Sequence, residues 1–174
     1  MGHTAEAVAE KYNISREDAD KFSYESHKKA GEAVDSGVFK NQIVPINVNE
    51  IFVENGLRKT TTNLVDTDEG VRRETTLEGL AKLNPVFKKG GIITAGNASQ
   101  TSDGAAFVLV VSESIIKEYN LNPIARLVSC AVGGVDPLYM GIGPCVALPK
   151  ALNQAGLKLE DIDLIELNEA FAAQ

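Results

Sequence analysis

The chain has 174 residues, of which 44% are apolar and 24% are charged, and this composition is that of a folded globular protein rather than a disordered one. Its formal net charge of -7 argues against a nucleic-acid-binding surface, and its apolar runs are far shorter than the roughly 20 residues that cross a bilayer. The first residues lack the basic stretch and apolar core of a secretory signal, which predicts a cytoplasmic location.

Two helices are predicted near the start of the chain. Thr4 can cap a short helix that ends near residue 12. Ser15 and Asp18 have the spacing of a capping box, and Gly37 is typical of the residue that follows a helix. Small and apolar residues recur between these signals at steps of three and four, which predicts an amphipathic helix over residues 16–36.

The next part of the chain is predicted to be extended or irregular. Apolar residues at 43–48 and 51–53 indicate short extended segments, and Pro45 confines the first of them to a sheet edge or a bulge. Residues 55–74 are polar and contain turn signals, so long loops are expected there. Loops of this kind often surround ligands.

A glycine-rich passage occupies the middle of the chain. A short helix over residues 77–83, closed by Pro85, precedes it. Residues 90–104 are rich in glycine and lead into a run of apolar, mostly β-branched residues at 107–111. Such a run predicts a strand that is buried on both faces.

The last third of the chain has the strand–helix–strand order that is typical of a parallel α/β sheet. Strands are predicted at residues 124–132 and 162–167, and a boundary between two units is predicted near residues 120–123. Helices are predicted to begin at Ser112, Cys145 and Asn168.

Two segments carry polar side chains suited to ligand binding. Small residues around Asn97 and Ser99 let the backbone approach a ligand closely, although a tight loop that enters a strand explains the same residues. Asn168 follows a predicted strand, where open α/β sheets keep their sites, and its amide can hold a water or stabilise an oxyanion. A helix N-cap is the alternative role for Asn168.

The remaining candidates carry weaker signals, and no metal site is predicted. Cys130 and Cys145 lack the spacing of zinc or redox sites and are predicted to be buried thiols. His3 and His27 have no partner nearby in the sequence and are predicted to be structural. Basic residues that could hold a phosphate-bearing ligand occur as two pairs, Arg72-Arg73 and Lys88-Lys89.

Short motifs occur in a fixed order along almost the whole chain. They begin with MGHTAE at residues 1–6 and end with NEAFAAQ at residues 168–174, and between them lie LNPVF, TAGNAS, DGAA, VDP and MGIGP. In this order and spacing the chain resembles the thiolase family, and most of all its acetyl-CoA acetyltransferase members.

The resemblance implies an α/β fold with the layered αβαβα architecture of thiolases, here incomplete. Residues 1–120 would be the remainder of a thiolase N-terminal domain, including a loop domain at about 13–95 that grips CoA, and residues 121–174 the first part of the C-terminal domain. The parent protein would be a homo-oligomer, either a dimer or a tetramer. Its partners would be acetyl-CoA and CoA, with the CoA thioester as substrate and without a metal or a separate cofactor.

The resemblance also implies a reaction. Two molecules of acetyl-CoA would condense to acetoacetyl-CoA, or the reverse, through an acyl-cysteine intermediate. Asn168 would hold the water of the oxyanion hole, Ser99 would meet the pantetheine arm of CoA, and Arg72 would contact its nucleotide end. Apolar or small residues would line the arm (Ala95, Leu83 and Phe87) and the acyl pocket (Met140, Ala170 and Phe171).

Other catalytic groups of the family are not matched in these residues. The nucleophilic cysteine of thiolases would lie upstream, and the acid/base histidine and second cysteine downstream, so the 174 residues alone are predicted to be inactive. Two alternatives remain, a non-catalytic CoA-binding or interaction module and a 3-oxoacyl-CoA thiolase of fatty-acid breakdown. Strands such as 107–111 and 124–132 would lack neighbours, and exposed edges are expected to promote self-association.

Overall fold

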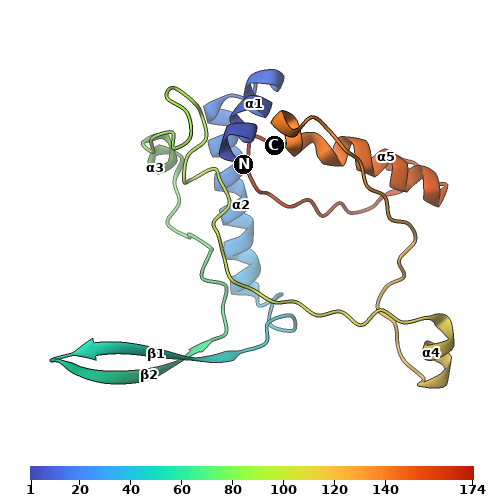
Figure 1. Ribbon diagram of the computed structural model, residues 1–174, viewed down its shortest axis with the longest axis horizontal. Helices are drawn as coiled ribbons and strands as arrows, with labels where there is room; N and C mark the ends of the chain where they lie inside the picture. Colours follow the sequence, from blue (N-terminus) through green and yellow to red (C-terminus); the bar gives the residue numbers. More distant parts are fainter.

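The computed structural model describes residues 1–174. Figure 1 shows both chain ends beside α1 and α2, a β-hairpin beyond the C-terminal end of α2, and α4 apart from the other helices. No helix has both the length and the apolar character needed to span a membrane. In chain order the elements are α1 (Gly2–Tyr12), α2 (Arg16–Ser36), β1 (Ile46–Glu54), β2 (Leu57–Val65), α3 (Leu77–Ala81), α4 (Glu113–Glu118), the 3-10 helix η1 (Pro137–Ile142), α5 (Gly143–Ala155) and the 3-10 helix η2 (Leu159–Asp161).

Helix α2 forms where the sequence predicts it, because both of its ends are specified locally. The Ser15 hydroxyl accepts a hydrogen bond from the Asp18 amide at 3.0 Å, and the Asp18 carboxylate accepts one from the Ser15 amide at 3.4 Å. Gly37 follows the helix with a φ of 74°. Thr76 and Ser112 cap α3 and α4 with their side chains in the same way. The predicted capping box is confirmed.

Helix α1 begins at Gly2, earlier than the sequence predicts. Thr4 lies inside the first turn, and its hydroxyl donates a hydrogen bond to the carbonyl oxygen of Met1 at 2.6 Å. The prediction that Thr4 is the N-cap is therefore wrong. The helix is held by packing rather than by a cap, since Ala5, Val8 and Ala9 on one face are buried.

The only sheet is the antiparallel hairpin of β1 and β2, in which Ile46 pairs with Val65. Asn55 and Gly56 connect the strands with positive φ values of 52° and 75°, as a two-residue hairpin turn requires. The prediction of loops over residues 55–74 is wrong for β2. Its β-branched threonines pair across the ladder, although both strands remain largely exposed.

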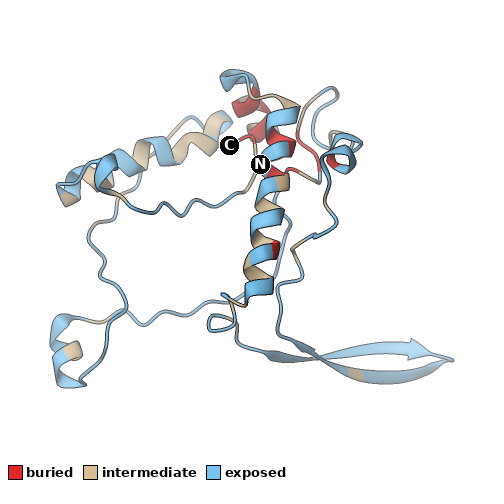
Figure 2. Ribbon diagram, turned by 180° about the vertical axis from the view of Figure 1, so that it is seen from behind, coloured by how far each residue is buried: buried red, intermediate tan, exposed pale blue.

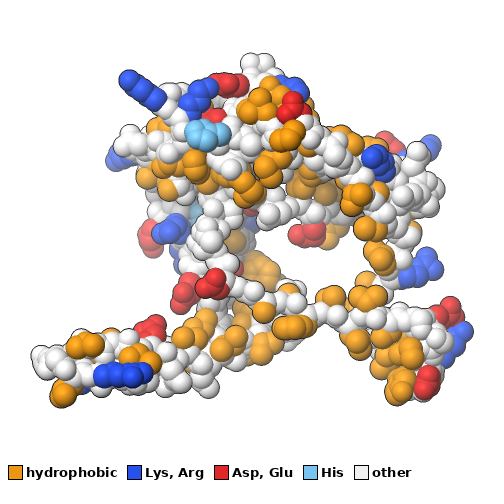
Figure 3. Space-filling view, viewed as in Figure 1, with side chains coloured by type: hydrophobic (Ala, Val, Ile, Leu, Met, Phe, Trp, Pro, Cys, Tyr) orange, Lys and Arg blue, Asp and Glu red, His pale blue; other side chains and the backbone are white.

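The three other predicted strands do not form. Residues 107–111, 124–132 and 162–167 pair with no other segment, because no neighbouring backbone lies alongside to complete a ladder (Figure 1). The prediction of burial on both faces is also wrong, since Val108 is 85% exposed. Hydrophobic side chains lie open along the segment that leads to α4 (Figure 3). Cys130 and Cys145 are exposed, contrary to prediction, because Cys130 lies in one of these unpaired segments and α5 buries none of its residues.

The buried core lies where α1, the first half of α2, the glycine-rich passage and the last residues of the chain meet (Figure 2). Ala5, Ala9, Ile93 and Ala173 form its apolar cluster. Polar side chains are buried beside this cluster, and every buried side-chain nitrogen and oxygen has a hydrogen-bond partner. Residues far apart in the sequence are therefore fixed against one another at this point.

Candidate functional site

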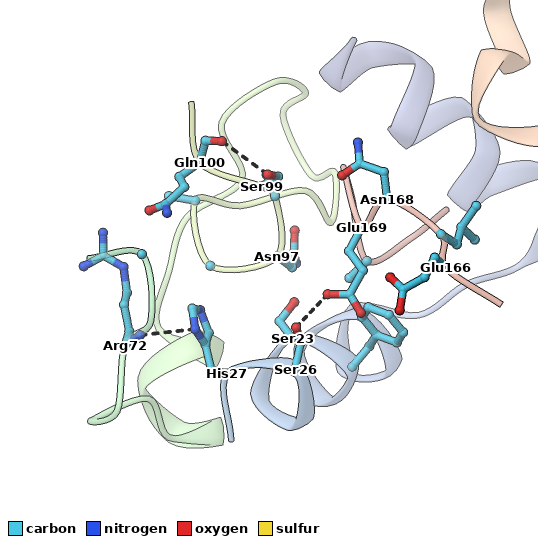
Figure 4. Close-up of a pocket in the computed structure, with 17 residues that line it drawn as sticks. Ser23, Ser26, His27, Arg72, Asn97, Ser99, Gln100, Glu166, Asn168 and Glu169 are labelled. Atoms are coloured by element: carbon cyan, nitrogen blue, oxygen red, sulfur yellow. Dashed lines mark hydrogen bonds between the residues drawn. The ribbon is translucent and has the colours of Figure 1, made fainter. Parts of the chain in front are cut away.

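A cleft of about 590 Å³ opens between α2, the turn at Arg72, residues 95–100 and residues 166–169 (Figure 4). Its lining is mainly polar, with side chains from α2 on one wall and the glycine-rich passage on the other. The structure brings four of the predicted site residues into this cleft, namely Arg72, Ala95, Ser99 and Asn168.

Two short backbone segments join the walls of the cleft. The Ser99 amide donates to the carbonyl oxygen of Ala170 at 2.8 Å, and the Ala172 amide donates to the carbonyl oxygen of Asn97 at 2.9 Å. An antiparallel bridge between Ala98 and Phe171 lies between these bonds. The helix predicted to begin at Asn168 does not form, because the backbone of residues 170–172 is paired across this seam instead.

Asn97 fixes the loop that carries Ser99. Its side-chain oxygen accepts a hydrogen bond from the Thr94 amide at 2.8 Å, and its side-chain nitrogen donates to the Ile92 carbonyl oxygen and to Asp20, both at 2.9 Å. Asn97 is 2% exposed, so these bonds are shielded from water. The interpretation of these small residues as a tight loop is correct for residues 94–97, and the same loop also lines the cleft.

Arg16 links this loop to α3. Its Nε donates to the Asp20 carboxylate at 2.8 Å, and its Nη2 donates to the carbonyl oxygens of Leu80 and Leu83 at 2.7 and 2.9 Å. The carbonyl groups at the end of a helix lack partners within the helix, and a guanidinium can satisfy several of them at once. The backbone at Leu83 is thereby fixed relative to α2.

Glu6 holds the other end of the glycine-rich passage. Its two carboxylate oxygens accept hydrogen bonds from the amides of Ile92 and Ile93, each at 3.0 Å. Glu6 is buried, and Gly91 lies so close to the carboxylate that a β-carbon there would collide with it. A buried carboxylate and a glycine without a side chain thus fix one loop conformation together.

The predicted apolar lining is only partly assembled. The rings of Phe87 and Phe171 meet edge to face with centroids 6.3 Å apart, and Leu83 lies against Gly96. None of these three side chains lines the cleft, and neither does Ala170. Met140 lies on η1, which packs against α1, and it is half exposed and separate from the cleft.

Two hydrogen bonds connect residues that line the cleft. The Ser26 hydroxyl donates to the Glu169 carboxylate at 2.6 Å, and the Arg72 amide donates to Nδ1 of His27 at 3.3 Å (Figure 4). The predicted structural role of His27 agrees with this contact, and His27 also lines the cleft. Glu166 lies on the same wall as Asn168.

The side chain of Asn168 is free to meet a ligand. It is exposed in the cleft and makes no hydrogen bond within the chain, and no helix begins at Asn168, so the N-cap alternative is wrong. The cleft offers amide, hydroxyl, carboxylate and guanidinium groups but no thiol, since no cysteine lines it. Its residues can therefore bind and orient a polar ligand, whereas covalent thiolate chemistry needs a group from elsewhere.

Sequence patterns alone did not identify the residues that support the cleft. Asp20, Glu6 and Ser26 all act through partners more than 70 residues away, and no local motif marks such contacts. The spacing of Arg16 and Asp20 on a predicted helix is the one signal that could have found their pair.

Comparison with known proteins gives agreement along the whole chain. A family model described as the thiolase N-terminal domain matches residues 1–114, and one described as the thiolase C-terminal domain matches residues 121–174. The chain is 52% identical over 174 residues to a protein of Rattus norvegicus named 3-ketoacyl-CoA thiolase B, peroxisomal. The aligned region covers 100% of this chain and 40% of that protein.

Two solved structures show the same agreement in three dimensions. An acetyl-CoA acetyltransferase of Bacillus anthracis superposes with a TM-score of 0.87 at 46% identity, over 99% of this chain and 42% of that one. Human mitochondrial 3-ketoacyl-CoA thiolase in complex with CoA superposes with a TM-score of 0.89 at 45% identity, over 99% of this chain and 41% of that one. The chain thus spans about two-fifths of the length of these relatives.

Proposed function

Because the chain belongs to the thiolase family and has the thiolase fold over the part that it covers, we propose that it forms the central segment of an acyltransferase acting on CoA thioesters. The enzyme condenses two molecules of acetyl-CoA to acetoacetyl-CoA, or cleaves acetoacetyl-CoA with CoA, through an acyl-cysteine intermediate. The observation that carries this proposal is that Ser99 and Asn168, 69 positions apart, line one cleft.

The roles proposed for the cleft residues follow from their chemistry. The free amide of Asn168 holds the water that stabilises negative charge on the thioester oxygen. Ser99 bonds the pantetheine arm of CoA, Ala95 lies beside it, and Arg72 binds the nucleotide end. The relative crystallised in complex with CoA supports CoA as the ligand class.

The apolar residues outside the cleft receive a second role in this proposal. Leu83 and Phe87 cover the pantetheine arm, and Met140, Ala170 and Phe171 line the acyl group. In support, Phe87 already contacts Phe171, and Ala170 is bonded to Ser99 through the backbone. Met140 is separate from the cleft, so in this proposal the rest of the enzyme completes the acyl pocket between Met140 and the cleft.

In this proposal residues 1–174 by themselves have no thiolase activity. The reaction needs a thiolate and a proton-transfer group at one place, and the cleft contains no cysteine. A dimeric or tetrameric parent and a cytoplasmic location remain predictions. The names of the two 3-ketoacyl-CoA thiolase relatives place them in peroxisomes and mitochondria.

A second candidate is a 3-oxoacyl-CoA thiolase of fatty-acid breakdown, which performs the same cleavage on longer chains. The relatives named 3-ketoacyl-CoA thiolase favour it, since one is 52% identical to this chain. A non-catalytic CoA-binding module is the third candidate. All three candidates use the same CoA-binding cleft, so they are distinguished by the reaction and by the chain length of the substrate.

The full-length protein tests the proposal directly. We expect it to cleave acetoacetyl-CoA in the presence of CoA, and Asn168→Ala to lower kcat by about 10²- to 10³-fold, as loss of an oxyanion-hole donor does. Ser99→Ala should raise KM for CoA by roughly 3- to 10-fold through one lost hydrogen bond. Asn63→Ala, on the exposed hairpin, is the matched control and should change neither constant.

The same assay separates the candidates. A series of 3-oxoacyl-CoA substrates from four to sixteen carbons should show the highest kcat/KM for acetoacetyl-CoA if the first candidate is right, and for a longer chain if the second is right. Binding of CoA without cleavage of any member would favour the third. A full-length protein that neither binds CoA nor cleaves any of these thioesters contradicts the proposal altogether.

A further inference from the structure

A largely buried ion pair on α2, Arg16 with Asp20, is bonded to Asn97 in the cleft wall. The Asp20 carboxylate uses both oxygens, one for Arg16 Nε at 2.8 Å and the other for the Asn97 side-chain amide at 2.9 Å. The side chains of Arg16 and Asp20 are only 20% and 6% exposed. Neither residue lines the cleft, so neither can touch a ligand in it.

The pair connects two separate parts of the proposed CoA site. On one side, Arg16 donates to the carbonyl oxygens of Leu80 and Leu83 and so fixes the backbone after α3. On the other side, Asp20 fixes Asn97, whose carbonyl oxygen and whose neighbour Ser99 form the seam with residues 170–172. One pair of side chains therefore connects the backbone at Leu83 to the loop that carries Ser99.

Packing between the two parts leaves little freedom for adjustment. Gly96 faces Leu80 and Leu83, and a β-carbon at Gly96 would lie 2.5 and 2.6 Å from their side-chain methyl groups. The side-chain oxygen of Asn97 is bonded to Thr94, and both hydrogens of its side-chain nitrogen are used, one by Ile92 and one by Asp20. A shift of α2 would consequently move the loop as a rigid piece.

A role in stability alone does not account for this arrangement well. Ion pairs that are mostly buried gain little over apolar residues of similar size, because both charges lose their hydration. In some proteins buried polar groups of this kind serve to specify one arrangement of the fold. Here the geometry specified is that of two segments on which a ligand site depends.

We propose that Arg16 and Asp20 are positioning residues that set the affinity of the enzyme for the pantetheine arm of its CoA thioester. They do so by holding the backbone of Leu83 and the loop of Ser99 in one arrangement. The inference rests on the function proposed above. It predicts that loss of the pair weakens CoA binding much more than it slows the chemical step, which depends on Asn168 and on groups outside this chain's cleft.

The experiment measures CoA affinity and steady-state constants in the full-length enzyme. Asp20→Asn should raise the Kd for CoA, measured by calorimetry, and KM for CoA in acetoacetyl-CoA cleavage on the order of tenfold, with kcat changed by less than about threefold. Arg16→Lys keeps the positive charge but loses the planar guanidinium that bonds several partners at once. It should also raise Kd and KM for CoA with little change in kcat, but by a smaller factor than Asp20→Asn.

A reciprocal exchange provides a rescue test. Asn97→Asp alone places two carboxylates together and also replaces the donor to the Ile92 carbonyl oxygen by an acceptor, so it should weaken CoA binding at least as much as Asp20→Asn. Only the first of these two losses can be reversed by a change at position 20. In the double variant Asp20→Asn with Asn97→Asp, the new amide at position 20 can donate to the new carboxylate at position 97. The double variant should recover part of the CoA affinity, whereas a merely additive loss contradicts a direct link between the two positions.

Ser15→Ala supplies the matched control for stability. It removes the cap of the same helix without touching the pair, so it should lower the melting temperature while leaving Kd for CoA unchanged. If Asp20→Asn behaves like Ser15→Ala, the inference is overturned and the proposed function survives. If the wild-type enzyme does not bind CoA, both are overturned. Should Asp20→Asn fail to fold, Arg16→Lys with unchanged Kd overturns the inference equally.

Discussion

The two asparagines of the site show how neighbours decide the use of a side chain. Asn97 is 2% exposed and bonded on every side, so its amide serves the fold. Asn168 is exposed in the cleft without a bond to the chain, so its amide is available to a ligand. The residue type is the same, and only the three-dimensional surroundings separate structural from ligand-binding use.

A side chain at Gly96 is expected to destabilise the fold, because two leucine side chains would have to move to admit it. A β-carbon there would lie 2.5 Å from Leu80 Cδ2 and 2.6 Å from Leu83 Cδ1, closer than van der Waals contact allows. Gly96→Ala should therefore lower the free energy of unfolding by about 1–3 kcal/mol, as overpacking does, and weaken CoA binding. Urea unfolding of the full-length protein measures the first effect.

Gly134→Ala is the control for this substitution, because a β-carbon at Gly134 meets nothing within 4 Å. It should change the free energy of unfolding by no more than about 0.5 kcal/mol. Equal effects of the two substitutions would show that the crowding around Gly96 relaxes without cost.

Single residues were predictable where a local motif marks them. Ser99 and Asn168 lie in motifs of recognisable order, and the structure places both in one cleft. Asp20 lies outside the motifs, and Glu6 ends the first motif without any local sign of its role, because their partners are 77 and 86 or 87 residues away. A buried carboxylate cannot be distinguished in sequence from a solvated one, because its burial depends on those distant segments.

At the scale of elements, helix ends were predictable and strand pairing was not. Ser15 caps its helix as the sequence predicts, and Thr76 and Ser112 cap the helices that were predicted to begin at or next to them, because a cap involves only neighbouring residues. Thr4 is the exception, since α1 begins two residues before it. A strand needs a partner, so an apolar run such as 107–111 predicts a strand only when the partner is present. Asn55-Gly56 is a hairpin signal, yet the polar sequence of β2 concealed the second strand.

The capping box of α2 should make the stability of the protein depend on pH. The Ser15 hydroxyl first, and then the Ser15 amide, donate to the Asp18 carboxylate and lower the pKa of Asp18 below its ordinary value of 3.8. The unfolded chain thus binds this proton more readily than the folded one. The stabilisation is fully present above the ordinary value and is lost as pH falls through the lowered one.

Thermal melts of the wild type and Asp18→Asn between pH 6 and pH 2.5 measure this effect. The melting temperature of the wild type should exceed that of the variant at pH 6, and the difference should shrink below about pH 4. In a Ser15→Ala background the same substitution should show a smaller change with pH, since the main donor is gone. A difference that stays constant across the range would contradict the assignment.

At the scale of the whole molecule, order is concentrated in one place. The core and the cleft adjoin, while the hairpin, α4 and the unpaired segments extend away from them (Figures 1 and 2). The thiolase fold was predictable because motifs run from one end of the chain to the other. The exposure of the apolar segments was not predictable, because composition indicates how much surface a chain can bury but not which segments pack against each other.

Residues 1–174 produced alone should self-associate. Phe107, Val108, Leu109 and Val110 are 81% to 96% exposed in a segment whose backbone pairs with nothing, and such edges join to one another. Sedimentation velocity at increasing concentration should show growing species. Val108→Lys with Val110→Lys should reduce them, because charge on an edge opposes pairing. A compact monomer with a cooperative melt would contradict the expectation.

The seam between Asn97 and Ala172 has an evolutionary consequence. Insertions and deletions in the 70 residues between its two sides leave it intact, so homologous chains are free to vary in length there. A single residue gained or lost inside either side would reverse which side chains face the cleft. Length should therefore be invariant in these two tripeptides even where neighbouring segments have drifted.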